Sequence, residues 1–137
     1  MIQTDSTMAH QIAQASIAFE QKRTGHAPKS VTVVLSENTL VITLHDALSP
    51  AEKDVARSPA GAAQVQEFHR QLFASSSESL RHEIKRITGV AVREATAEVQ
   101  TMTGAIMQIF ATGTVVQVFL LDQSVPVDRW SGSGPDD

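Results

Sequence analysis

The sequence contains no cysteine and no tyrosine, and aromatic residues make up only 4% of its 137 positions. Without cysteine the chain cannot form a disulfide, use a thiol nucleophile or bind zinc through thiolates. This absence fits a cytoplasmic protein, which is the location we expect. Because 42% of the residues are hydrophobic but few carry rings, the core should be aliphatic.

Positive charge is also scarce, since 11 Lys and Arg residues against 15 Asp and Glu residues give a formal net charge of −4. Nucleic acids and anionic membrane surfaces require clustered cations, so we expect neither as a partner. The most apolar segment, residues 105–121, is broken by glutamine, threonine and glycine and alternates like a strand, so no membrane span is expected. The first residues lack the basic start and apolar run of a signal peptide. We therefore expect a soluble chain without direct membrane insertion.

The strongest pattern that is present predicts one long amphipathic helix from Ser58 to Gly89. Ser58 suits the N-cap, Pro59 the first helical position and Gly89 the left-handed residue that ends a helix. Apolar residues recur at spacings of three, four or their multiples: Val65, Phe68, Leu72, Leu80, Ile84 and Ile87. At 1.5 Å per residue such a helix is about 45 Å long, enough to cross a sheet of four strands.

The elements before this helix are also visible. A first helix has Met8, Ile12, Ala15 and Phe19 on its apolar face, Asp5 or Ser6 as its cap, and Gly25 at its end. Alternating residues predict a hairpin of Val31–Leu35 and Leu40–Leu44 with one strongly apolar face. The segment Ser49-Pro50-Ala51-Glu52 is a capping box that opens a short helix.

After Gly89, residues 90–101 read as a further strand. Residues 105–121 predict either one long strand with a glycine bulge or two strands in a hairpin. The order α-β-β-α-α-β-β predicts an α+β fold, a two-layer sandwich with a mainly antiparallel sheet of about four strands covered by the helices. Residues 1–121 should form a single domain, and residues 122–137 a disordered tail that carries Trp130.

No catalytic motif is present. The histidines do not form a His-Glu-x-x-His pair, no Gly-x-Ser-x-Gly elbow occurs, and no glycine-rich phosphate loop is found. A metal site around His45 and Asp46 is a minor alternative to solvated histidines. The run Ser75-Ser76-Ser77 indicates close packing in the long helix, with a slight bend or a partner contact as the alternatives. We expect no enzyme activity, no metal and no cofactor.

Several motifs together resemble a known family over residues 11–121. In chain order they are Gly25 and Pro28, then Asp46-Ala47-Leu48-Ser49-Pro50-Ala51-Glu52, Phe68-His69-Arg70, Thr88-Gly89 and Val116-Gln117-Val118-Phe119-Leu120-Leu121. These segments resemble the MpsC family, small bacterial proteins long grouped as a domain of unknown function. We refer to Gly25, Pro28, Leu48, Ser49, Glu52, Arg70 and Gly89 as the family-motif residues and expect structural roles for them.

The resemblance implies a link to a sodium-translocating, membrane-potential-generating system whose other components are integral membrane proteins. It therefore favours a non-enzymatic accessory or regulatory protein that acts by protein contact, with a membrane protein as a partner. The alternative is a small-molecule-binding regulatory domain with a pocket between sheet and helices.

The last expectation from the sequence is a homodimer. The helices can cover one face of the sheet, yet apolar residues occur on both sides of its strands. A second copy is the simplest cover for the other face, with Val34, Val41, Val115 and Phe119 as the predicted interface residues. The alternative is a monomer in which the long helix and the first helix wrap both faces of the sheet.

Overall fold

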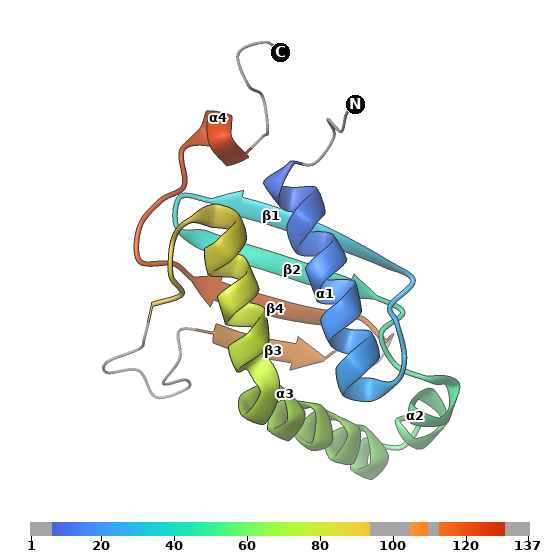
Figure 1. Cartoon of the computed structure of the whole chain (residues 1–137). Coiled ribbons are helices and arrows are strands. Elements are labelled where there is room, and N and C mark those ends of the chain that lie inside the picture. The colour runs from blue at the N-terminus through green and yellow to red at the C-terminus, as the bar shows by residue number, and fades with distance from the viewer. Residues whose placement is uncertain (1–6, 94–104, 110–112, 131–137) are drawn as a thin grey trace.

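The computed structural model describes residues 7–93, 105–109 and 113–130. Its elements are α1 (Met8–Thr24), β1 (Ser30–Ser36), β2 (Thr39–His45), α2 (Pro50–Val55), α3 (Pro59–Thr88), β3 (Ala105–Ile109), β4 (Val115–Leu120) and α4 (Val127–Trp130). Figure 1 shows two layers, in which α1 and the C-terminal half of α3 lie side by side over one face of the sheet. The predicted α+β class and order of elements are confirmed, with α4 added at the end.

The four strands form one antiparallel sheet in the order β1-β2-β4-β3. β1 and β2 are the predicted hairpin. Residues 105–121, which could have been one strand or two, form two antiparallel strands in which Ile109 pairs with Val115. Of the strand predicted over 90–101, the described part contributes an isolated bridge between Val92 and Leu121, and residues 94–104 lie outside the described residues.

β4 turns the opposite set of side chains toward the helices from the set predicted. Its register places Phe119 opposite Leu40 of β2, and directly paired residues point to the same side of a sheet. Val115 and Phe119 are therefore fully buried in the core. The prediction that these two residues lie on a free interface is wrong, because the alternate residues Val116 and Val118 occupy that face.

Local signals set the helix ends much as predicted. The Ser58 side chain accepts a hydrogen bond from the Gly61 N–H at 3.0 Å, and the left-handed Gly89 donates its N–H to the Lys85 carbonyl at 2.7 Å. α1 is capped by Thr7, whose hydroxyl accepts from the His10 N–H, and not by Asp5 or Ser6.

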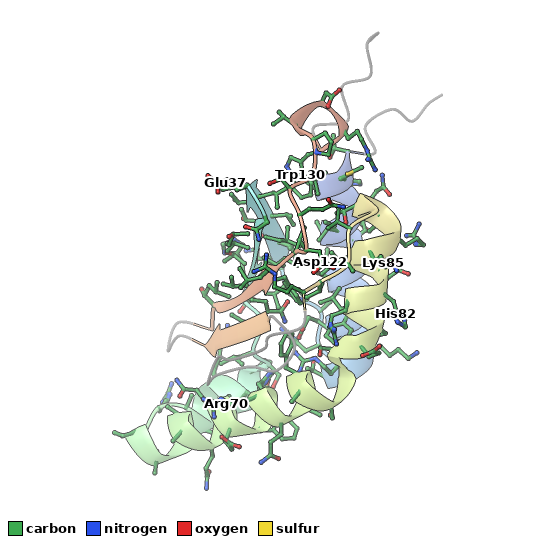
Figure 2. All side chains as sticks on the ribbon, turned by 90° about the vertical axis from the view of Figure 1, so that its left-hand side faces the viewer. Glu37, Arg70, His82, Lys85, Asp122 and Trp130 are labelled. Atoms are coloured by element: carbon green, nitrogen blue, oxygen red, sulfur yellow. The ribbon has the colours of Figure 1, made fainter. Side chains whose placement is uncertain are left out.

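α3 changes direction near its middle, as Figures 1 and 2 show, so that its N-terminal half projects past the edge of the sheet. The bend lies close to the serine run, where the Ser75 hydroxyl donates to the Leu72 carbonyl at 3.2 Å. Serine clusters and such back-bonding accompany helix bends. In the half of α3 that precedes the bend, the apolar stripe is broken. Phe68 is 53% exposed, whereas Phe73 is buried beside Phe119.

The segment after β4 differs from the disordered tail that was predicted from residue 122. Val125 is buried, and Trp130 of α4 packs against the core. The Arg129 guanidinium donates to the Thr88 carbonyl at 3.2 Å and so satisfies the C-terminal end of α3. The predicted tail is therefore corrected for residues 122–130, and residues 131–137 lie outside the described residues. Among the helices of the described residues, none is long and apolar enough to cross a membrane.

Candidate functional site

Two family-motif segments meet where α2 packs against α3. Ser49 and Glu52 form the predicted capping box: the Ser49 N–H donates to Glu52 Oε1 at 2.9 Å, and the Glu52 N–H donates to Ser49 Oγ at 3.2 Å. Glu52 Oε2 lies 2.7 Å from Nε2 of His69 on α3. One carboxylate thus caps α2 and ties it to α3.

The environment of this pair defines its chemistry. His69 is fully buried, and the Phe68 ring contacts it edge-on with centroids 5.7 Å apart. Burial raises the pKa of the Glu52 carboxyl, but the hydrogen bonds from the Ser49 N–H and from His69 outweigh burial, so this pKa lies below its usual value. Glu52 is therefore ionised at neutral pH and suited to accept hydrogen bonds, not to act as a general acid.

A close backbone approach fixes the contact between α2 and α3. A Cβ at Gly61 would lie 1.8 Å from the Val55 carbonyl oxygen, so only glycine fits there. Val55 and Phe68 remain exposed beside a shallow groove of about 220 Å³ between the two helices. We call residues 50–74, which comprise α2 and the N-terminal half of α3, the arm.

The remaining family-motif residues are spread over the fold. Gly25 and Gly89 end α1 and α3 with φ of +81° and +80°, a conformation that favours glycine. Pro28 and Leu48 are buried. Arg70 is exposed on the arm and forms an ion pair within α3. Among the described residues, the family-like segments therefore bring together the carboxylate of Glu52 and the imidazole of His69, which bind each other.

A second polar group, which the apolar pattern of the sequence did not predict, is buried between α1 and the sheet. We call Ser16, Glu20, Arg23 and Gln117 the buried polar cluster. Arg23 Nη2 lies 2.6 Å from both Glu20 carboxylate oxygens, and the Gln117 amide donates to Glu20 Oε2 at 3.4 Å. Only 3% of the Arg23 side chain is exposed, and its guanidinium lies 5.3 Å from the Phe19 ring centre. The cluster thus holds a desolvated ion pair in the core.

The sequence did contain a signal for this cluster. Ile12, Ser16 and Glu20 recur every four residues, and these are the buried residues of α1. The predicted apolar face used Ala15 and Phe19, which are only partly buried. A polar residue at a buried helix position is read as solvent-facing when only its polarity is considered.

The buried polar cluster is not internally satisfied. Among the described residues, Ser16 Oγ, Gln117 Oε1 and two Arg23 nitrogens (Nε and Nη1) have no hydrogen-bond partner. An unmade hydrogen bond at a buried group costs about 1–3 kcal/mol. We expect ordered water to bridge these atoms, so that the cluster fixes the position of α1 on the sheet.

No helix of the described residues covers the face of the sheet opposite α1 and the C-terminal half of α3, as the side view in Figure 2 shows. Val34, Val41 and Val118 form one row across three strands, because Val34 pairs with Val41 and Val41 with Val118. Val34 is 52% exposed, and Leu120 on the same face is 37% exposed. We call this set, with Val116, the open sheet face. It contains the predicted interface residues Val34 and Val41.

The residues considered for a metal are engaged elsewhere. His45 Nε2 lies 2.9 Å from the Thr32 hydroxyl, and Asp46 forms an ion pair with Lys53. The hydrogen bond from Lys53 lowers the pKa of the Asp46 carboxyl. Within the described residues no group of three or more His, Asp or Glu could hold a metal ion.

Comparisons with known proteins agree with the resemblance. The family model described as "Na+-translocating membrane potential-generating system (MpsC)" matches residues 4–123. The uncharacterized protein YbcI of Bacillus subtilis (strain 168) is 24% identical over 110 residues, which cover 80% of this chain and 89% of YbcI. No solved structure matches the chain significantly.

Proposed function

The chain belongs to the MpsC family, and from this premise we propose that it is a cytoplasmic, non-enzymatic accessory protein that acts by protein contact in a membrane-potential-generating system. The observation that supports a contact role is the open sheet face. Contiguous exposed aliphatic residues on a soluble domain mark interaction surfaces. Val34 and Leu120 are exposed there although β1 and β4 place equally apolar residues in the core.

The first partner in this proposal is a second copy of the chain. With strands about 4.8 Å apart and about 20 Å long, a four-stranded face measures about 20 by 20 Å. This is about half of the roughly 800 Å² that each partner buries in a stable complex. The arm projects to the same side as the open sheet face, as Figure 2 shows, and supplies further surface for a two-fold dimer.

Light scattering of the purified chain at micromolar concentration tests the dimer. The wild-type chain should have twice the mass of the 14.8 kDa monomer. Val118→Asp places a charge in the open sheet face and should give a folded monomer, because an unpaired charge cannot be buried in the interface. A wild-type mass of one chain that does not change on dilution contradicts the dimer.

Val127→Asp is the matched control. Val127 is 81% exposed but lies on α4, away from the open sheet face. This variant should remain a dimer. Circular dichroism must show the same helix content for both variants, so that loss of the dimer is not confused with loss of the fold.

The accessory role is tested in cells that lack the chromosomal copy of this chain. A potential-sensitive dye should report a lower membrane potential, restored by the wild type and by Val127→Asp but not by Val118→Asp. Full restoration of the membrane potential by Val118→Asp would show that the accessory role does not require the dimer. An unchanged potential in the deletion strain would contradict the accessory role.

The alternative function, a small-molecule-binding regulatory domain, is supported by one observation. The unpaired atoms of the buried polar cluster lie between sheet and helices, where the predicted pocket was placed. Under this alternative a ligand should raise the melting temperature of the wild type and leave that of Gln117→Leu unchanged. A thermal-shift screen of polar metabolites distinguishes the two functions.

A further inference from the structure

An open cleft of the described residues lies away from the open sheet face and from the groove between α2 and α3. It has a volume of about 470 Å³, within the range of small-molecule sites. One wall is the C-terminal half of α3, with Arg81, His82 and Lys85. The other is formed by the bridged segments around Val92 and Leu121, where Arg93 and Asp122 line the cleft. Figure 2 shows His82, Lys85 and Asp122 on this side of the molecule.

The facing wall is held by backbone hydrogen bonds. The Arg93 N–H donates to the Leu120 carbonyl at 2.7 Å, and the Asp122 N–H donates to the Ala91 carbonyl at 2.9 Å. These bonds fix the backbone from which the Arg93 and Asp122 side chains extend. The cleft is therefore formed by ordered backbone on both sides.

Among the described residues, two cations of the cleft have no acidic partner. Within the part of the chain that the structure describes, neither Lys85 nor Arg93 forms an ion pair, although both line the cleft. A lysine near a helix C-terminus usually interacts with the negative end of the helix dipole and with the last carbonyl groups. Here the last carbonyls of α3 are already bonded, since Thr88 Oγ1 donates to the Ile84 carbonyl at 2.7 Å and Arg129 donates to the Thr88 carbonyl.

The acids of the cleft compensate its cations only in part. Glu78 lies 3.3 Å from both Arg81 and His82, but its side chain is 69% exposed, so these contacts are weak. Among the described lining residues, Arg81, Lys85 and Arg93 stand against Glu78 and Asp122, a formal charge of +1 with His82 counted as neutral. The chain as a whole carries a formal charge of −4. The described lining of the cleft thus carries a small positive excess on an acidic protein, and Lys85 and Arg93 are its cations that form no ion pair with the described residues.

We propose that this cleft binds a compact multivalent oxyanion, held chiefly by Lys85 and Arg93. Guanidinium and ammonium groups bind phosphate and carboxylate oxygens by charge-assisted hydrogen bonds. Among the described lining residues there is no Phe, Tyr or Trp, and Ala91 and Val92 are the apolar surface; the one ring is the imidazole of His82, whose side chain is 72% exposed. A single exposed imidazole is a small surface for base stacking, so the lining favours a small phosphorylated or polycarboxylic molecule over a nucleotide.

The test is calorimetric titration of the full chain with pyrophosphate and with citrate, which separate the phosphate and carboxylate forms of this chemistry. Wild type should bind at least one of them with one site per chain, and more weakly as salt rises. Lys85→Gln/Arg93→Gln should weaken binding about tenfold or more, because two charge-assisted contacts are lost.

The matched control is Lys22→Gln/Lys29→Gln, which removes the same charge from two exposed residues outside the cleft. It should bind within about twofold of wild type, and thermal melts should show that both double variants fold. The proposal is overturned if wild type shows no saturable binding of either anion, or if both double variants lose affinity equally. Binding of an acidic peptide but of neither small anion also overturns it and assigns the cleft to a protein partner. Val118→Asp should bind as wild type does, so this result is independent of the proposed dimer.

Discussion

The motif pair of Glu52 and His69 and the buried polar cluster solve the same physical problem in different ways. In each, a largely buried glutamate binds a nitrogen-bearing side chain of an α-helix: Glu52 binds His69, and Glu20 binds Arg23. Glu52 keeps 21% of its side chain exposed and accepts a further hydrogen bond from a backbone N–H. Glu20 is only 2% exposed, and its cluster leaves several polar atoms unpaired.

The difference shows that the two groups contribute to the stability of different parts of the fold. The motif pair satisfies a helix end and joins two neighbouring helices, so it stabilises local structure. The buried polar cluster joins α1 to β4 across 97 positions of sequence and replaces what could have been apolar contacts in the core. Buried ion pairs of this kind contribute little net stability but become very costly when only one partner is removed.

The largest predicted effect follows from this asymmetry. Glu20→Ala leaves the Arg23 guanidinium buried without a counter-charge and should lower the free energy of unfolding by about 3–5 kcal/mol. Glu67→Ala is the control, because it breaks an exposed pair with Arg70 and should cost less than about 1 kcal/mol. Urea denaturation measures both.

A double variant sharpens this prediction. Glu20→Leu/Arg23→Met replaces the whole ion pair by apolar side chains and should recover most of the loss seen with Glu20→Ala. If the double variant is as unstable as the single one, the cluster contributes real net stability, and its description as a positioning contact is wrong.

The same comparison explains what the sequence could predict. The capping box, the caps of α3 and the β1–β2 hairpin depend on residues a few positions apart, and all are confirmed. The hydrogen-bond partner of Glu52, by contrast, is His69, 17 positions away. The hydrogen bond between Glu20 and Gln117 spans 97 positions. Such contacts are set by tertiary packing, which no local spacing encodes.

β4 shows why the faces of the sheet were assigned incorrectly. Both alternations of this strand are apolar except for Gln117, whose polarity suggests a solvent-facing side. In the structure Gln117 is fully buried, and Val118 lies on the open sheet face. The pairing with β2 decides the orientation, because Phe119 must accompany Leu40 into the core.

A smaller effect is predicted for the helix cap of the motif pair. Ser49→Ala removes the oxygen that accepts the Glu52 N–H and should cost about 1 kcal/mol in the free energy of unfolding. Ser75→Ala is the matched control, since its exposed hydroxyl caps no helix end, and it should change stability by less than about 0.5 kcal/mol. Full stability of Ser49→Ala combined with loss of the dimer would show that Ser49 acts at an interface instead.

The smallest effect is expected from the charge of Glu52 alone and appears as a dependence on pH. The folded-state pKa of Glu52 lies below its unfolded value of about 4.3, so its contribution to stability is present above that pH. It is lost as the pH falls through the lower folded-state pKa, because protonation removes the charged acceptor for Ser49 and His69.

Glu52→Gln keeps an oxygen for the capping box but has no charge to lose. The difference in unfolding free energy between wild type and Glu52→Gln should therefore be largest near pH 6 and shrink toward pH 3. Urea titrations at several pH values measure it, with Glu37→Gln, an exposed turn residue, as the control. If Glu52→Gln follows the same pH profile as this control, the hydrogen bonds to Ser49 and His69 do not stabilise the charged form of Glu52 in solution.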